Sequence, residues 1–276
     1  MTAAVHVGGA GENLVLLHGL GARWQIFTPI VGALEQHYRV YAFDLPGFGA
    51  QPYDPSLRPG IAGLADWVCA ELQTRGIRFP HIVGSSMGAG IALELAHRGI
   101  AGRVTAFAPI GFWNVAERLW CVGILSVLRT AAQALPGPLG AALRTRAGRA
   151  VLLFPLFGRP TRVDPQAAIA DLAALASCAG FGPARAAFRT QHSIPADDGV
   201  PTTIVWGRRD LVLPARSQSR RARQLWGRAH HVLLDGCGHL PFSDDPERCV
   251  ALILGQHAVG QHSIDKNAPL LEKDTP

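Results

Sequence analysis

Short runs of apolar residues alternate with stretches whose apolar positions have helical spacing over the first 112 residues of the chain. Each run has the length of a strand, and each intervening stretch has the length of a helix. We predict strands at residues 14–17, 38–43, 81–83 and 104–108, and helices at residues 27–36, 63–74 and 89–98. Continuously apolar strands that alternate with helices are typical of a parallel sheet covered by helices on both faces. The pattern therefore predicts an α/β fold with a doubly wound, mostly parallel sheet.

The alternation stops between residues 113 and 195, where the chain is rich in Ala, Leu and Arg and is divided by several prolines. This segment has apolar positions with helical spacing and no run typical of a strand. The alternation then resumes, with predicted strands at residues 202–206 and 231–234 and predicted helices at residues 214–226 and 246–254. A helical block that interrupts an α/β pattern indicates an insertion into one domain rather than a second domain.

The predicted organisation is one α/β core, formed by residues 1–112 and 196–255, with a helical cap at residues 113–195. Two apolar runs of the cap, at residues 119–128 and 151–157, either line a pocket beneath the cap or pack its helices together.

Composition excludes several classes of protein. With 276 residues, of which 48% are hydrophobic and 17% charged, the chain is long enough to bury a large core and is unlike a disordered protein. It has no run of about 18 apolar residues, so we predict no membrane-spanning helix, and its N-terminus lacks the features of a secretory signal. The polar tail at residues 256–276 has little apolar periodicity, and we expect it to be disordered.

The five cysteines form an odd set and contain no CxxC pair. This spacing indicates neither a disulfide framework nor a zinc site. We therefore predict a cytoplasmic location, no bound metal and no cofactor.

Positive charge is concentrated in the predicted cap. The formal net charge is +6, yet residues 1–112 and residues 196–276 are each neutral, whereas residues 113–195 carry nine arginines and three carboxylates. A basic surface attracts nucleic acids, anionic membranes or acidic substrates. Because nothing else in the chain supports nucleic-acid binding, we predict no such partner. Peripheral contact of the cap with a membrane and a preference for acidic substrates remain two open hypotheses.

A short glycine-flanked motif, Gly84-Ser85-Ser86-Met87-Gly88, lies between a predicted strand and a predicted helix. A nucleophile on such a sharp turn has a strained backbone, so the residues two positions before and after it need to be small. Ser86 has glycines at both positions and Ser85 does not, so we choose Ser86 as the nucleophile. The N-terminus of the following helix places its positive dipole beside the hydroxyl.

A serine hydroxyl is a weak nucleophile and requires a neighbouring base that a third group orients. Asp210 and His239 each follow a predicted strand, so both lie beyond the carboxyl ends of strands, where an open parallel sheet forms its site. Asn114 and Asp235 are alternatives to Asp210. An amide does not supply the charge that stabilises an imidazolium, and Asp235 lies close to the end of its strand, so we prefer Asp210.

Four motifs together resemble the α/β-hydrolase fold superfamily, in its lid-bearing branch of serine hydrolases and esterases. They are LLHGLGA at 16–22, DLPGFG at 44–49, GSSMG at 84–88, and the paired segments WGRRD and GCGHLPFSDDPE. The resemblance implies that Ser86 is the nucleophile, His239 the general base and then acid, and Asp210 the orienting carboxylate. It also implies an oxyanion hole formed by the backbone N–H groups of Leu20 and Met87. Few residues precede the first motif, so we expect the first strand of the family to be missing or very short.

The resemblance also implies a reaction, the transfer of the acyl group of a small-molecule carboxylic ester to water through an acyl-enzyme. Hydrolysis of a C–C bond in a diketone-type substrate uses the same triad in this family and stays open as an alternative. A non-catalytic ligand-binding or scaffold role on the same fold is a third hypothesis, which the complete triad disfavours. A serine nucleophile also disfavours the dehalogenases and epoxide hydrolases of this branch, which use aspartate.

Five apolar residues adjoin these motifs, and we predict that they line the substrate pocket. They are Trp24, Phe48, Phe112, Trp113 and Leu240.

Overall fold

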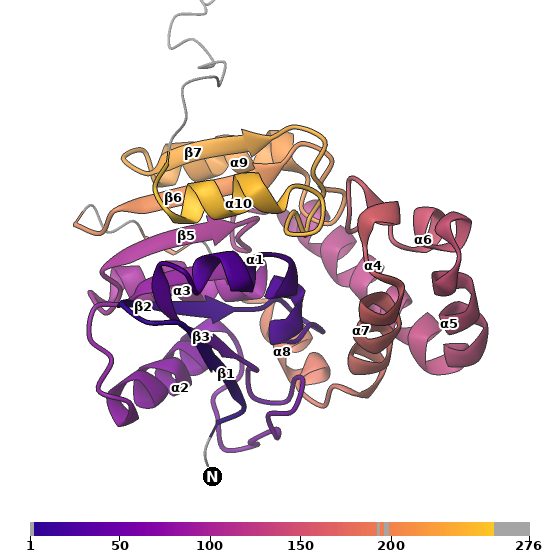
Figure 1. Ribbon diagram of the computed structural model, residues 1–276, viewed down its shortest axis with the longest axis horizontal. Coiled ribbons are helices and arrows are strands. Elements are labelled where there is room, and N and C mark those ends of the chain that lie inside the picture. The colour runs from indigo at the N-terminus through magenta and orange to yellow at the C-terminus, as the bar shows by residue number, and fades with distance from the viewer. Residues whose placement is uncertain (1–2, 192–193, 196–198, 257–276) are drawn as a thin grey trace, which may run out of the picture.

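The computed structural model describes residues 3–191, 194–195 and 199–256, and from residue 257 onward the predicted polar tail lies outside this part of the chain. Within the described residues, seven strands form one sheet in the order β1-β3-β2-β4-β5-β6-β7 (Figure 1). β1 is antiparallel to β3, and the other neighbouring pairs are parallel. The strands are β1 (Val5–Gly8), β2 (Glu12–Leu17), β3 (Tyr38–Phe43), β4 (His81–Ser85), β5 (Arg103–Phe107), β6 (Thr202–Gly207) and β7 (His230–Leu234).

Helices cover both faces of the sheet because successive strand residues point to opposite sides. Leu14 and Leu16 of β2 belong to one apolar cluster, which α1 (Thr28–Leu34) and α10 (Pro246–Ile253) complete. Val15 and Leu17 belong to a second cluster on the other face. The helices packed there are α2 (Ile61–Thr74), α3 (Met87–His97) and α9 (Ala215–Leu225). These two layers confirm the predicted doubly wound α/β sheet.

The strand registers align the carboxyl ends of neighbouring strands at one edge of the sheet. Gly84 near the end of β4 lies opposite Leu17 at the end of β2. Gly207 at the end of β6 lies opposite Leu234 at the end of β7. The segments that follow β4, β6 and β7 therefore leave the sheet on the same side, where open parallel sheets form their binding sites.

The predicted elements of the core are present, with differences at their ends. The predicted helix at residues 27–36 is the shorter α1, preceded by the 3-10 turn η1 (Trp24–Phe27). The first strand, expected to be missing or very short, is the four-residue β1. It pairs with the backbone groups on the outer side of β3, so that a short strand forms this edge of the sheet.

Between β5 and β6 the described chain contains helices and no strand, and we call residues 113–195 the cap. Figure 1 shows the cap helices beside the core, beyond the ends of the strands. They are α4 (Val115–Ala134), α5 (Pro136–Arg144), α6 (Arg146–Leu152), η2 (Pro160–Arg162), α7 (Pro165–Ser177) and α8 (Phe181–Ala187). The Asn114 side chain accepts the N–H of Glu117, and the Glu117 carboxylate accepts the N–H of Asn114, so the two form the capping box that begins α4.

Among the described residues, no single helix combines the length and the apolar composition that a membrane crossing requires. Two consecutive pairs, α4 with α5 and α7 with α8, reach that apolar length only together, and they are bent by 101° and 74°. Both pairs belong to the cap.

Candidate active site

Ser86 occupies a strained turn between β4 and α3. Its φ of 55° and ψ of −110° place it in a region that residues with a side chain seldom adopt. The Ser86 N–H donates to the carbonyl oxygen of Phe107 at 2.8 Å, and its own carbonyl accepts the N–H groups of Gly90 and Ile110. Hydrogen bonds on both sides of the residue hold this conformation in place.

The glycines around Ser86 are required by close backbone contacts. A Cβ atom at Gly84 would lie 2.2 Å from the carbonyl oxygen of Gly88, and one at Gly88 would lie 2.0 Å from the carbonyl oxygen of Leu17. Both distances are far below van der Waals contact, so neither position accepts a side chain without moving the backbone. The glycine pattern predicted for the turn therefore has a direct steric cause.

His239 and Asp210 form a buried hydrogen-bonded pair. His239 Nδ1 lies 2.9 Å from Asp210 Oδ2, and Asp210 Oδ1 accepts the backbone N–H groups of Val212 and Leu213 at 2.9 and 2.8 Å. An ionised carboxylate only accepts hydrogen bonds, so the imidazole proton is assigned to Nδ1. This leaves Nε2 of the neutral ring as the available base. The alternative acid Asp235 is exposed and pairs with Arg208, away from the imidazole.

The two backbone N–H groups of the expected oxyanion hole belong to Leu20 and Met87. Met87 is the first residue of α3, directly after Ser86, and Leu20 is in the loop that follows β2. Among the described residues, neither N–H donates a hydrogen bond to a protein acceptor. Two such donors close to a nucleophile stabilise a developing oxyanion, each by about 3 kcal/mol.

His18 holds the loop that carries Leu20. Its Nε2 accepts the N–H of Leu45 at 3.0 Å, and its Nδ1 lies 2.8 Å from the carbonyl oxygen of Gly19. Burial lowers the pKa of the His18 ring, which keeps it neutral and able to donate on one side and accept on the other. His18 therefore positions the oxyanion loop rather than acting on substrate.

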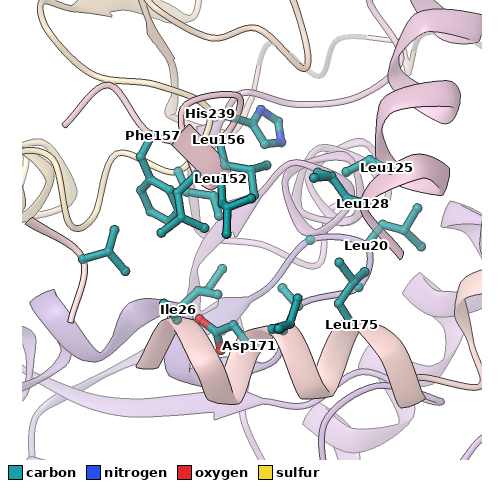
Figure 2. Close-up of a pocket in the computed structure, with 18 of the residues that line it drawn as sticks. Leu20, Ile26, Leu125, Leu128, Leu152, Leu156, Phe157, Asp171, Leu175 and His239 are labelled. Carbon is teal, nitrogen blue, oxygen red and sulfur yellow. The ribbon is translucent and has the colours of Figure 1, made fainter. Parts of the chain in front are cut away.

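A cavity of about 180 Å³ extends from Ser86 and His239 into the cap. Most of its lining is aliphatic (Figure 2). Cap residues at the wall include Leu125, Leu128, Leu139, Leu143, Leu152, Leu153, Leu156, Phe157, Val163, Leu172 and Leu175. The two apolar runs of the cap do both things that the sequence left open, because Leu152 and Leu153 line the cavity and also pack against the cap cluster of Leu143, Val163 and Ala168. Other residues of these runs, such as Val127 and Phe154, are exposed.

The cavity contains one carboxylate, that of Asp171 on α7. Figure 2 shows it across the cavity from the ring of His239. Asp171 Oδ1 accepts the Nε–H of Arg23 from the core at 2.9 Å. Burial raises the pKa of the Asp171 carboxyl, and the Arg23 guanidinium opposes that effect. Sequence reasoning missed this pair because its partners are 148 positions apart in the chain.

Of the five predicted pocket residues, Leu240 lines the cavity and the four aromatic residues do not. Trp24 stacks on His6 with 4.5 Å between ring centroids. Phe48 and Phe112 are buried in the core, and Trp113 packs against Phe188. Proximity to a motif in the sequence did not predict where these side chains point, because each of the four rings packs against the apolar core instead of facing the site.

The loop that carries His239 is joined to the cap through Asp244, a buried residue that sequence reasoning did not single out. Its carboxylate accepts the backbone N–H groups of Gly158 and Arg159 in the cap, at 2.8 and 2.6 Å, and that of Gly238 at 2.8 Å. The N–H of Leu240 donates to the carbonyl oxygen of Leu156. The feature of the sequence that could have pointed to Asp244 is its place in the GCGHLPFSDDPE segment, which also contains His239.

A family model described as the alpha/beta hydrolase family matches residues 14–252, which include the whole of this site. The chain belongs to the alpha/beta hydrolase family. Several curated relatives are named as esterases or hydrolases, and the chain is accordingly a hydrolase.

Two curated relatives and one solved structure illustrate the range of this alpha/beta hydrolase family. The pimeloyl-[acyl-carrier protein] methyl ester esterase of Aromatoleum aromaticum is 28% identical, over 87% of this chain and 96% of that protein. The epoxide hydrolase EphH of Mycobacterium tuberculosis is 29% identical, over 70% of this chain and 92% of that protein. The 2-hydroxy-6-oxo-6-phenylhexa-2,4-dienoate hydrolase of Rhodococcus sp. strain RHA1 has a TM-score of 0.73 and 20% identity, covering 92% of this chain and 94% of its own. This last likeness concerns the fold alone.

Proposed function

We propose that this alpha/beta hydrolase is a serine esterase that cleaves carboxylic esters with a medium-sized apolar acyl group. The observation that carries the proposal is the Asp210–His239 hydrogen bond, which leaves Nε2 of His239 as a base in the cavity that Ser86 also lines. The relatives named as methyl ester esterases support ester hydrolysis.

The proposed reaction has two halves. Ser86 Oγ attacks the ester carbonyl carbon while His239 Nε2 takes the hydroxyl proton, and Asp210 stabilises the imidazolium. The N–H groups of Leu20 and Met87 stabilise the oxyanion. The imidazolium then protonates the leaving alcohol, so that the C–O bond breaks and an acyl-Ser86 ester remains. A water molecule, deprotonated by His239, releases the acid and restores the serine.

The cavity supports the choice of acyl group. An engineered cavity of about 150 Å³ lined by Leu, Ile and Phe stays dry and binds benzene. A volume of about 180 Å³ with a comparable lining suits an aliphatic or aromatic acyl group of about six to eight carbons. We therefore expect kcat/KM for p-nitrophenyl hexanoate to exceed that for the acetate by about tenfold or more, since each buried methylene contributes about 0.8 kcal/mol. Equal values for the two esters would contradict this assignment.

A fluorophosphonate probe tests the nucleophile, because it labels only an activated serine. We expect the wild-type protein to be labelled and Ser86→Ala to be neither labelled nor active on p-nitrophenyl esters. Ser85→Ala is the matched control, since Ser85 is buried beside the nucleophile and its hydroxyl has no partner among the described residues. Absent labelling of the wild type, or undiminished labelling of Ser86→Ala, would refute the proposal. A diketone substrate assayed in parallel distinguishes C–C bond hydrolysis by the same triad.

A further inference from the structure

Helix α4 has an apolar face that is turned to solvent. Val115, Leu119, Trp120 and Val127 are between 54% and 68% exposed. Their spacing places them on one side of the helix. The exposed residues that share this side are also uncharged, namely Ala116, Gly123, Thr130 and Ala134. A helix of this length extends about 30 Å, so the face is a long strip rather than an isolated apolar residue.

The opposite side of the same helix has a different environment. Leu125 and Leu128 line the cavity, and Cys121 and Ala132 are buried. The packing of the cap and the lining of the cavity therefore account for the inner side of α4. On the outer side, the indole N–H of Trp120 donates to the carbonyl oxygen of Leu211 in the core at 2.7 Å, while the side chains of Val115, Leu119 and Val127 stay exposed. Monomeric proteins seldom expose contiguous apolar strips unless the strip contacts another surface.

Basic side chains border the outer face. Arg118 follows Val115 by one turn at its flank, and Arg185 of α8 donates to the hydroxyl of Ser126 on α4. Neither arginine forms an ion pair with any residue that the structure describes. Two of the three cap carboxylates are already paired with arginines of the core, Glu117 with Arg221 and Asp171 with Arg23. The border of the strip therefore carries the positive charges of Arg118 and Arg185, with which no described carboxylate is paired.

This charge selects between two occupants of the strip. Docking of a second copy of the chain through α4 would bring two positive caps together, which is unfavourable. An anionic lipid surface is complementary both to the apolar strip and to the arginines that border it. Its headgroups bind arginine, and the boundary between headgroups and acyl chains accepts apolar side chains. Trp120 is an amphipathic ring of the kind that is enriched at the membrane interface.

We infer that the strip formed by Val115, Leu119, Trp120 and Val127 docks on an anionic lipid bilayer, with α4 lying in the plane of the membrane interface. The apolar side chains enter the boundary between headgroups and acyl chains, and Arg118 and Arg185 bind lipid phosphates. In this orientation α4 lies between the bilayer and the cavity that Leu125 and Leu128 line. The inference is independent of which bond the active site cleaves.

Vesicle co-sedimentation tests this surface with the full-length protein. We expect the wild type to bind vesicles of phosphatidylcholine with about 30% phosphatidylglycerol, and to bind pure phosphatidylcholine vesicles at least tenfold more weakly. Raising the salt concentration to about 0.5 M should release a large part of the bound protein, because it screens the arginine–phosphate attraction. Retention in the supernatant with both vesicle types would overturn the inference.

Two double variants separate the apolar and the charged contributions. Leu119→Ser with Val127→Ser should weaken binding to the anionic vesicles by about tenfold or more. Arg118→Gln with Arg185→Gln should weaken it by about thirtyfold, since each arginine near an anionic surface contributes about 1 kcal/mol to binding. Neither pair includes a residue that lines the cavity, so activity on a water-soluble p-nitrophenyl ester reports that the variants are folded.

The matched control is Phe79→Ser with Leu225→Ser. Both side chains are large, apolar and exposed, and both lie toward the starts of the strands, at the edge opposite the cap. This variant should bind vesicles as the wild type does. Equal loss of binding in the control would show general surface stickiness and overturn the inference. A dimer in sedimentation velocity that Leu119→Ser with Val127→Ser dissociates would assign the strip to self-association instead.

Discussion

Asp244 accepts the backbone N–H of Gly158 at 2.8 Å, and this hydrogen bond ties the cap to the loop that carries His239. The same carboxylate oxygen accepts the N–H of Gly238, the residue immediately before His239. The main-chain oxygen of Asp244 accepts hydrogen bonds from the side chains of Arg159 and Arg162. One buried residue therefore determines the position of the histidine loop relative to the cavity wall.

Replacing Asp244 by asparagine should lower both stability and turnover. An amide NH2 group replaces one carboxylate oxygen and cannot accept a hydrogen bond from the backbone N–H that faces it. A buried unsatisfied group of this kind costs about 1–3 kcal/mol. We expect a lower urea midpoint and a reduced kcat with a smaller change in KM, since the histidine loop loses its anchor.

The neighbouring Asp245→Asn variant is the control for Asp244→Asn. Asp245 accepts the N–H of Arg248 as the N-cap of α10, a role that asparagine performs equally well. Its stability and kcat should stay close to wild type. If Asp244→Asn behaves in the same way, the proposed anchoring role of Asp244 is wrong.

Asp210→Asn tests the orientation of the catalytic base. The amide oxygen still accepts the N–H groups of Val212 and Leu213, so the fold should be retained, but the amide nitrogen then faces Nδ1 of His239 and favours the wrong tautomer. We expect kcat to fall by about 10³- to 10⁴-fold with an unchanged far-UV circular dichroism spectrum. Turnover near that of the wild type would assign the acid to another carboxylate.

We expect the buried His81 ring to make the folded protein less stable in acid. Burial lowers its pKa from 6.5 to about 3, and Nε2 lies 3.0 Å from the hydroxyl of Thr105. Between these two pKa values the unfolded chain binds a proton at His81 that the folded chain does not. The free energy of unfolding is therefore highest, as far as His81 is concerned, above the unfolded pKa, and it falls as the pH decreases through this window. We expect His81→Gln to reduce the slope of unfolding free energy against pH by up to about 1.4 kcal/mol per pH unit between pH 6 and 4. Urea titrations at several pH values measure this slope, and identical slopes would exclude His81 as a contributor.

Gly88 should not tolerate a methyl group. Its Cβ would lie 2.0 Å from the carbonyl oxygen of Leu17, so Gly88→Ala forces α3 away from the sheet at the nucleophile turn. We expect a loss of more than about 3 kcal/mol of stability, or failure to fold. Gly32→Ala, in α1 with open space around its Cβ position, should instead be neutral or stabilising by about 0.5–1 kcal/mol. Thermal unfolding of the two variants side by side checks this difference.

The α/β core and the candidate triad could be predicted from the sequence because both depend on local order along the chain. Apolar runs of strand length, separated by helical stretches, determined the sheet and its two covering layers. The glycines on either side of Ser86 determined the turn, since their effect acts over four residues. Asp210 and His239 could be assigned because each follows a strand, and parallel strands end at one edge of the sheet.

Only the tertiary structure decided which side chains form the cavity, because that depends on how the cap packs against the core. The sequence shows that α4 is apolar, yet packing alone directs Leu125 into the cavity and Val127 to solvent. The Arg23–Asp171 pair joins residues 148 positions apart, which no local pattern reveals. Sequence determined the chemistry available at the site, and the long-range packing of cap on core determined the space in which that chemistry acts.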